Sequence, residues 1–175
     1  MNILVCIKQV PDTTEIKIDP VKHTLIREGV PSIVNPFDAC ALEMAVRLKE
    51  KEGGKVVVIS MGPAQAKNAL KECLAVGADQ AFLVTDRAFG GSDTLATSYI
   101  LSRAIAAVET KTGEKFDLIF CGKQAIDGDT AQVGPEIAEH MDLPHVTLAT
   151  AVEMADGKLH VTRDTDEGHD LVEVS

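Results

Sequence analysis

Residues 116–135 read FDLIFCGKQAIDGDTAQVGP, and this stretch decides the fold. The apolar run 116–121 predicts a strand, and Ile137, Ala138 and Met141 predict the apolar side of a helix that follows the loop. A strand that turns into a helix through small and polar residues leaves backbone N–H groups free beside a crevice. Such groups and the helix dipole favour an anionic ligand, typically a phosphate. These residues leave open the alternative of an ordinary strand-to-helix turn.

Two aspartates in this loop bear on the kind of ligand and on the helix start. Asp127 and Asp129 repel phosphate, so they suit ribose hydroxyls or helix capping better. Asp129 and Gln132 have the spacing of a capping box. If the helix begins at Thr130, Pro135 lies past the first turn and kinks the helix. Otherwise the loop continues, and Pro135 is the first helical residue.

Working outward, apolar strand-like runs alternate with helix-like segments along most of the chain. The predicted strands are residues 2–7, 55–60, 81–84 and 116–121. Repeated strand–helix units imply right-handed crossovers, so we expect an α/β fold with a parallel sheet and helices on both faces. Ligands of such folds bind beyond the carboxyl ends of the strands. The loops expected to converge at that edge are residues 6–8, 61–62, 85–93 and 122–134.

Two of the helices have recognisable starts. Asn35-Pro36-Phe37-Asp38 predicts a helix in which Asn35 is the cap and Pro36 the first residue, with an acidic residue in the first turn. A second helix is predicted from residues 92–94 to about residue 109. Its expected apolar face comprises Leu95, Tyr99, Ile100, Ala104 and Val108.

The remaining segments are β-like. Residues 13–28 alternate charged and apolar side chains, which predicts a small hairpin inserted before the first helix. The tail is predicted to be β-rich, with strands at residues 146–148, 151–154, 159–163 and 171–174. We expect residues 1–175 to form a single domain, because this length suits one core.

The composition argues against several classes of partner and binding site. The formal net charge is −10, from 27 acidic and 17 basic residues, and no basic stripe is present, so nucleic acid and anionic membranes are not expected partners. The sequence has neither a signal peptide pattern nor an apolar run of membrane-spanning length, which predicts a cytoplasmic protein. The four cysteines and five histidines lack metal-ligand spacing. We therefore expect no metal site, and cysteines that are buried and reduced.

Several catalytic and nucleotide motifs are missing from the sequence. No G-x-G-x-x-G follows a strand, no P-loop occurs, and no Ser, Cys or Lys has the surroundings of a nucleophile. Residues 90–94, GGSDT, are close to the S-G-G-x-D-S loop of ATP pyrophosphatases. This suggests an ATP-using enzyme in which Ser92 and Asp93 hold phosphates and magnesium. A plain helix cap by Ser92 is the alternative.

Several motifs together resemble a known family. They occur in the family's order and extend over most of the chain: VCIKQVPD at 5–12, VNPFD at 34–38, SMGPAQ at 60–65, AVGAD at 75–79 and GKQAIDGD at 122–129. This set is similar to the β subunit of electron transfer flavoprotein. Residues 87–98, RAFGGSDTLATS, resemble the version found in anaerobic, electron-bifurcating members.

The resemblance implies a Rossmann-like fold of the adenine-nucleotide-binding type that works as a heterodimer with an α subunit. It implies bound AMP in ordinary members, or FAD in the same place in bifurcating members. The flavin performs the redox chemistry, so no catalytic side chain is expected. The implied cofactor contacts are Cys6, Asn35, Asp38, Met61, Gly122, Lys123, Gln124, Ala125, Ile126, Asp127, Gly128, Asp129, Thr130, Ala131, Gln132 and Val133, with Asp93, Thr94 and Thr97 added in the bifurcating form.

The resemblance also implies electron donors and acceptors. These are an acyl-CoA dehydrogenase in ordinary members, or NADH with ferredoxin or flavodoxin in bifurcating members. Members of the family continue beyond the position of Ser175 with a dehydrogenase-docking loop and an arm around the α subunit, so the sequence is interpreted as a C-terminally truncated member. An ATP pyrophosphatase-type enzyme and an ATP-binding stress-type module are the alternative functions.

Overall fold

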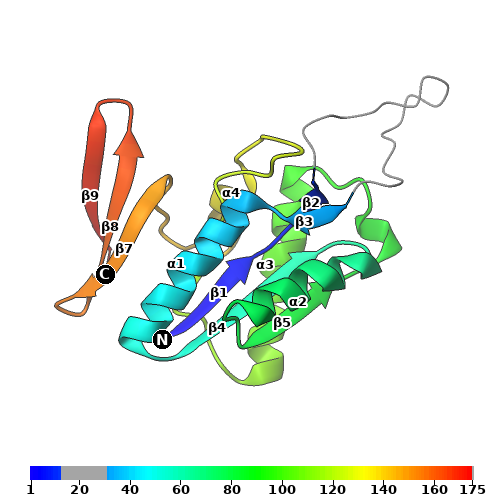
Figure 1. The fold of residues 1–175 in the computed structure, drawn as a ribbon, viewed down its shortest axis with the longest axis horizontal. Coiled ribbons are helices and arrows are strands. Elements are labelled where there is room, and N and C mark those ends of the chain that lie inside the picture. The colour runs from blue at the N-terminus through cyan, green and yellow to red at the C-terminus, as the bar shows by residue number, and fades with distance from the viewer. Residues whose placement is uncertain (13–30, 175) are drawn as a thin grey trace.

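A parallel four-stranded sheet forms the centre of the molecule in a computed structural model that describes residues 1–12 and 31–174 (Figure 1). Its strands are β1 Asn2–Cys6, β4 Lys55–Met61, β5 Gln80–Val84 and β6 Leu118–Cys121. The order is β5-β4-β1-β6, and each neighbouring pair is parallel. The predicted α/β fold with a parallel sheet is confirmed.

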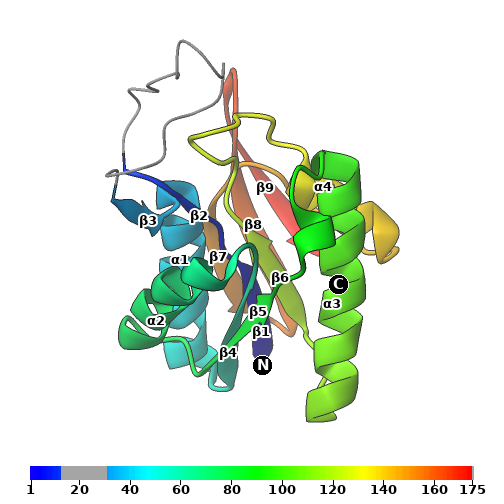
Figure 2. The same ribbon diagram turned by 90° about the vertical axis from the view of Figure 1, so that its right-hand side faces the viewer.

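Helices cover both faces of this sheet (Figures 1 and 2). They are α1 Pro36–Glu52, α2 Lys67–Ala75, α3 Thr94–Thr112 and α4 Val133–His140. Successive side chains of a strand point to opposite faces. Ile3 and Val5 therefore pack in the core under α1 and α2, whereas Leu4 and Cys6 pack in the core under α3 and α4. Burial on both faces explains why β1 is apolar throughout.

Smaller elements connect these layers. The short strands β2 Gln9–Pro11 and β3 Ser32–Val34 pair antiparallel, and single turns of 3₁₀ helix, Ala64–Ala66 and Arg87–Phe89, follow β4 and β5. The hairpin predicted at residues 13–28 lies outside the described residues. Within the described residues, no helix is both long and apolar enough to cross a membrane.

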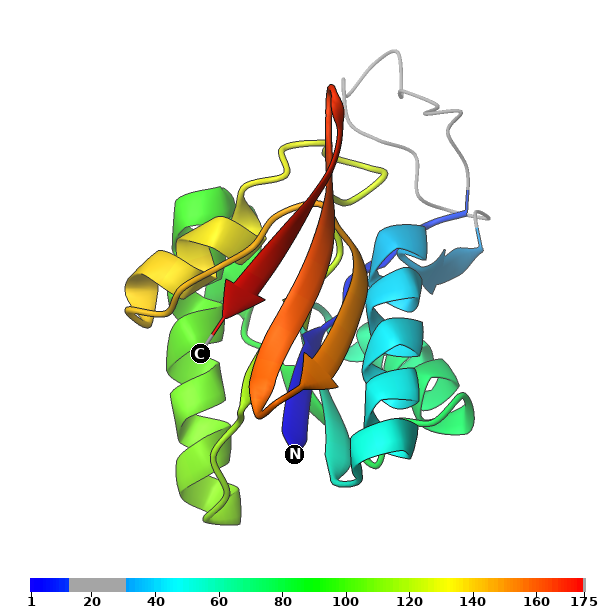
Figure 3. The same ribbon diagram turned by 90° about the vertical axis from the view of Figure 1, so that its left-hand side faces the viewer.

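The C-terminal part forms a separate antiparallel sheet beside α1 (Figure 3). Its strands are β7 Ala149–Ala155, β8 Lys158–Thr165 and β9 Gly168–Val174, in the order β7-β8-β9. Asp156 and Gly157 join β7 to β8 with φ of 52° and 76°, the left-handed pair that a tight hairpin turn needs. The β-rich tail is confirmed, although residues 146–148 are not a strand.

The apolar face predicted for α3 is partly wrong. Leu95 and Tyr99 are 60% and 55% exposed, while Ser98 and Ser102 are buried beside Leu101. Each buried serine donates its hydroxyl to the carbonyl three residues earlier, at 2.9 and 2.7 Å. A serine whose hydroxyl is bonded within its own helix can pack in the core as a small residue. The apolar side chains alone therefore predicted the wrong buried face for α3.

The cysteines are free thiols in different surroundings. Cys6 and Cys73 are buried, Cys121 is half-buried and Cys40 is exposed, so the prediction of buried thiols is wrong for Cys40. Burial raises the pKa of the Cys73 thiol to about 11, which makes that thiol a poor nucleophile. Among the described residues, no group of three His, Cys, Asp or Glu side chains is arranged to hold a metal ion.

Candidate functional site

The carboxyl ends of the four parallel strands lie along one edge of the sheet (Figure 1). Cys6 at the end of β1 is the register partner of Cys121 at the end of β6, and Met61 at the end of β4 is the partner of Val84 at the end of β5. The loops after these strands therefore start side by side. The predicted convergence of the four loops at this edge is confirmed.

The loop 122–132 joins β6 to α4, and its details differ from the expected capping. The helix begins at Val133, which places Pro135 third in the helix. The N–H groups of the first turn have no partner within their own helix, so proline is tolerated there and no kink is needed. The predicted capping box is wrong, because the N-cap is Gln132 and the Asp129 Oδ1 accepts from the Gln124 Nε2 at 2.8 Å.

The second half of this loop has the backbone of an anion site. Asp129 and Ala131 have φ of 50° and 53°, in the left-handed region. Alternation of right- and left-handed residues turns successive N–H groups toward one side of a chain. Among the described residues, the backbone N–H groups of residues 130–133 have no hydrogen-bond partner. These donors lead directly into the N-terminal end of α4, where the helix dipole also favours negative charge.

An ion pair neutralises one of the two loop carboxylates. The Lys8 Nζ lies 2.6 Å from the Asp127 Oδ1, with the two side chains 49% and 29% exposed. A pair this exposed contributes at most about 1 kcal/mol to stability. Its effect on the site is to reduce the repulsion that Asp127 exerts on a phosphate. Sequence reasoning missed Lys8 as a functional residue, although its position directly after the first strand was a usable signal.

The start of α1 is bound to this loop through Asn35, whose side chain is 1% exposed. The Nδ2 donates to the Gln124 carbonyl at 2.8 Å, and the Oδ1 accepts from the Ile126 N–H at 3.2 Å. Asn35 occupies the N-cap position as predicted, but its side chain is turned toward the loop and makes no cap bond to α1. The local pattern was right about the helix start and wrong about the hydrogen bonds.

Asp38, in the first turn of α1, holds two strand ends together. Its Oδ2 accepts from the Lys8 N–H at 2.7 Å, and its carboxylate lies against Gly122. Burial raises the pKa of Asp38 to about 6, against the opposing effect of the Lys8 and Gly122 N–H groups and the Asn35 side chain. A β-carbon on Gly122 would lie 2.2 Å from the Asp38 Oδ1, so this close approach requires glycine.

The residues at the start of α3 reach the same edge. The Thr94 hydroxyl lies 3.3 Å from the Gln132 Oε1 and 3.2 Å from the Glu136 Oε1, which connects α3 to the start of α4. Thr97 is one turn further along α3, where its N–H donates to the Asp93 carbonyl. The Asp93 Oδ1 caps α3 by accepting from the Ala96 N–H at 2.8 Å. The cap is therefore Asp93 and not Ser92, whose hydroxyl donates to Phe89.

The capping role of Asp93 gives a first prediction. Asp93→Ala is expected to lower the free energy of unfolding by about 1 kcal/mol, because one N–H of the first turn loses its acceptor. Asp93→Ser keeps a capping oxygen and is expected to stay within about 0.5 kcal/mol of the wild type. Urea denaturation monitored by circular dichroism gives the free energy of unfolding of both variants. Equal losses in the two variants would contradict the capping role.

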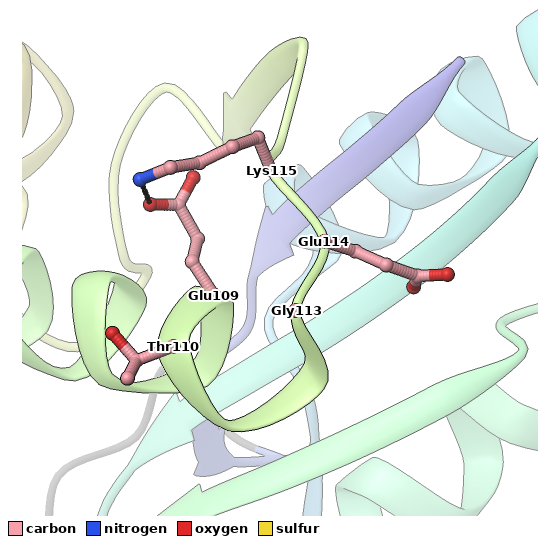
Figure 4. A pocket seen from close by; sticks show the side chains of 5 residues that line it. All are labelled: Glu109, Thr110, Gly113, Glu114 and Lys115. Carbon is pink, nitrogen blue, oxygen red and sulfur yellow. Dashed lines mark hydrogen bonds and ion pairs between the residues drawn. The ribbon is translucent and has the colours of Figure 1, made fainter.

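A shallow cavity of about 220 Å³ lies elsewhere in the fold, at the C-terminal end of α3 (Figure 4). Its lining residues are Glu109, Thr110, Gly113, Glu114 and Lys115. The Glu109 carboxylate accepts from the Lys115 Nζ at 2.6 Å and from the Phe116 N–H at 3.1 Å. These bonds close the turn that leads into β6, at the edge opposite the carboxyl ends. We therefore interpret this cavity as a feature of the turn and not as a functional site.

The fold and this edge together define an α/β protein of the doubly wound type, with a strand-to-helix loop that exposes backbone donors. The sequence pattern of the Electron transfer flavoprotein domain matches residues 22–175. The chain belongs to the electron transfer flavoprotein family.

Named relatives agree with this assignment. The chain is 60% identical over 174 residues to the electron transfer flavoprotein subunit beta of Thermoanaerobacterium thermosaccharolyticum, covering 99% of this chain and 65% of that protein. It is 54% identical over 175 residues to the caffeyl-CoA reductase-Etf complex subunit CarD of Acetobacterium woodii, with coverage of 99% and 65%. It is 52% identical over 178 residues to the protein FixA of Azotobacter vinelandii, with coverage of 100% and 63%. The chain thus spans somewhat less than two thirds of the length of these relatives.

Proposed function

We propose that this chain is the nucleotide-binding part of an electron transfer flavoprotein β subunit, and that it binds AMP or FAD at the loop 122–133. The observation that carries the proposal is the row of N–H groups at residues 130–133, which have no partner among the described residues and lead into α4. Such a row is suited to the phosphate groups that AMP and FAD share. The family membership of the chain supports the same function.

Further groups at this edge fit a nucleotide. Thr94 and Gln132 supply a hydroxyl and an amide beside the free N–H groups. The Glu136 Oε2 is buried and has no partner within the described part of the chain, so it is suited to accept from a ligand hydroxyl. Lys8 offsets the charge of Asp127. The remaining contacts expected from the resemblance, including Cys6 and Met61 at their strand ends and Thr97 on α3, belong to this proposal.

The chemistry of the proposed function resides in the cofactor. A bound flavin accepts and donates electrons, whereas AMP has only a structural role. The side chains of this chain bind and orient the nucleotide at the sheet edge, and no side chain need act as acid, base or nucleophile. The function of the whole protein is then electron transfer as a heterodimer with an α subunit.

The electron-bifurcating form is part of the proposal. It is supported by the similarity of the chain to a subunit of a caffeyl-CoA reductase-Etf complex. In this form NADH is the donor and ferredoxin or flavodoxin an acceptor, with FAD at the loop. For the AMP-binding form, the corresponding proposal is that electrons are exchanged with an acyl-CoA dehydrogenase. A cytoplasmic location and the organisation of residues 1–175 as one domain remain predictions.

The ATP pyrophosphatase alternative is less well supported. It requires the Asp93 carboxylate to hold magnesium and phosphates, but one oxygen of that carboxylate caps α3. The family membership and the named relatives favour the electron-transfer function over this enzyme and over a stress-type module.

The proposed function is tested by releasing the bound small molecule with heat and recording its absorption spectrum. We expect either the yellow spectrum of FAD or the purine absorption of AMP, in an amount near one per chain. Hydrolysis of ATP with release of pyrophosphate, and no bound nucleotide, would replace this function with the pyrophosphatase alternative.

Gly128→Val provides a mutational test of the loop. A β-carbon at Gly128 meets nothing within 4 Å, so the fold should accept valine while its side chain fills space beside the loop. We expect the variant to retain its thermal unfolding temperature but to lose most of its nucleotide, with Gly128→Ala intermediate. Position 131 is less suitable, because its φ of 53° would itself strain a β-branched residue. Full nucleotide content in Gly128→Val would count against this loop.

A further inference from the structure

Asn35 is almost fully buried, and its backbone and side chain are bonded to other parts of the protein. Its backbone N–H donates to the Lys8 carbonyl at 2.9 Å, and its carbonyl accepts from the N–H groups of Asp38 and Ala39 at 2.9 and 3.0 Å. Its side chain donates from Nδ2 to the Gln124 carbonyl and accepts at Oδ1 from the Ile126 N–H. Both ends of the amide are thus bonded to the loop, and the residue is only 1% exposed.

The bonds from Asn35 hold Gln124 and Ile126, which lie near the start of the loop. The carbonyl of Ala125, between the two residues that Asn35 binds, accepts from the N–H groups of Gly128 and Asp129 at 3.3 and 2.9 Å. These bonds define the turn that brings Asp129 into its left-handed conformation, with φ of 50°. The N–H groups of residues 130–133, which have no partner in the described part of the chain, follow directly. Asn35 is thus connected to the candidate anion site through the backbone of the loop.

We propose that Asn35 is a positioning residue for nucleotide recognition, which sets the conformation of residues 124–129 and does not contact the nucleotide through its side chain. This inference rests on the proposed function and changes the role that the family resemblance implies for Asn35. The side chain supplies two hydrogen bonds to the backbone of the loop, one to the Gln124 carbonyl and one from the Ile126 N–H. Its burial, at 1% exposure, excludes water from competing for these bonds.

Asn35→Ala tests the inference, with Asn2→Ala as the matched control. The Asn2 Nδ2 also donates to a backbone carbonyl, that of Lys115 at 3.1 Å, but at the opposite edge of the sheet. Two quantities are measured on the full chain: hydrogen exchange of the Ile126 amide without nucleotide, and the dissociation constant of AMP by calorimetry. In Asn35→Ala we expect about tenfold or more faster exchange and about tenfold or more weaker binding. Asn2→Ala should leave both at their wild-type values.

Asn35→Asp separates the donor from the acceptor. The charged carboxylate keeps an acceptor for the Ile126 N–H but faces the Gln124 carbonyl without a proton to donate. Protonation restores a donor and an acceptor in the same shape. The measurement is made in the Asp38→Asn background, which removes the titration of the neighbouring carboxyl. Relative to that background at each pH, AMP binding by Asn35→Asp should be weak at pH 8 and recover toward pH 5. A residue needed only for overall stability would not show this recovery in a folded protein.

The outcomes distinguish the positioning role from the alternatives. Weaker AMP binding with unchanged Ile126 exchange would make Asn35 a direct contact and overturn the proposal, as would wild-type values of both quantities. If the wild type binds neither AMP nor FAD, the proposed function fails, and the Ile126 exchange rate alone then decides whether Asn35 sets the loop conformation. If Asn35→Ala does not fold, the pH series of Asn35→Asp decides the question.

Discussion

Gly122→Ala is expected to lower the free energy of unfolding by roughly 3 kcal/mol and to abolish nucleotide binding at the adjoining loop. The added β-carbon would lie 2.2 Å from the Asp38 Oδ1 and 2.7 Å from both the Asp38 nitrogen and the Phe37 carbonyl carbon. Two of these three atoms are backbone at the start of α1, and the third belongs to a buried carboxylate. None can move without separating α1 from the strand ends that Asp38 holds together.

Gly128→Ala is the matched control for the stability part of this prediction, because it makes the same chemical change in the same loop. A β-carbon at Gly128 meets nothing within 4 Å, so we expect the free energy of unfolding of Gly128→Ala to stay within about 0.5 kcal/mol of the wild type. Urea denaturation gives the stability of both variants, and calorimetry with AMP gives their affinity. Equal stability of Gly122→Ala and Gly128→Ala would show that α1 does not pack against β6 as closely as described.

Asp38 is expected to make the protein less stable as the pH rises from about 4 to 6. Burial raises the pKa of this carboxyl to about 6 in the folded protein, from 3.8 as the ordinary value. Between these values the folded state binds more protons than the unfolded state, so the free energy of unfolding falls with rising pH. The full difference is roughly 3 kcal/mol, reached above pH 6, because each unit of pKa corresponds to about 1.4 kcal/mol.

The comparison of wild type with Asp38→Asn between pH 4 and 7.5 measures this effect. The asparagine cannot ionise, so the stability of the wild type relative to the variant should decrease as the pH rises and level off above pH 6. Other carboxylates cancel in this difference. Burial raises the pKa of Asp79, but the Val56 N–H and the Lys49 ammonium outweigh burial and leave that pKa lowered, in wild type and variant alike. A pH-independent difference would mean that Asp38 titrates as an exposed carboxyl does.

Much of the fold could be predicted because it follows from local patterns. Continuous apolar runs identify β1 and β4 as strands buried on both faces, and Pro36 after Asn35 marks the first residue of α1. Asp156 and Gly157 identify the hairpin turn of the tail. The parallel order of the strands then brings their carboxyl ends to one edge, so the place of the candidate site follows from topology alone.

The errors arose where a side chain bonds a partner other than the one that its local pattern predicts. The serines of α3 are buried because their hydroxyls bond within the helix, so their polarity misled the prediction of the buried face. Asn35 has the sequence features of a helix cap, yet its side chain binds a loop 89 residues away. The Asp129 carboxylate was expected to cap α4 and instead accepts from Gln124. The competing partner is a carbonyl of the same helix for the serines, a residue of the same loop for Asp129 and a distant loop for Asn35.

The order of strands and helices, the edge at which the loops meet and the family of the chain are determined by the sequence alone. They depend on the period and order of apolar residues, which are local properties of the chain. Only the tertiary structure decided that Asn35 and Asp38 bind the ends of β1 and β6, and that Gly122 must lack a side chain. It also decided that the N–H groups of residues 130–133 have no partner within residues 1–12 and 31–174. These features depend on which polar groups meet when α1 packs beside the loop after β6, and no spacing along the sequence encodes that meeting.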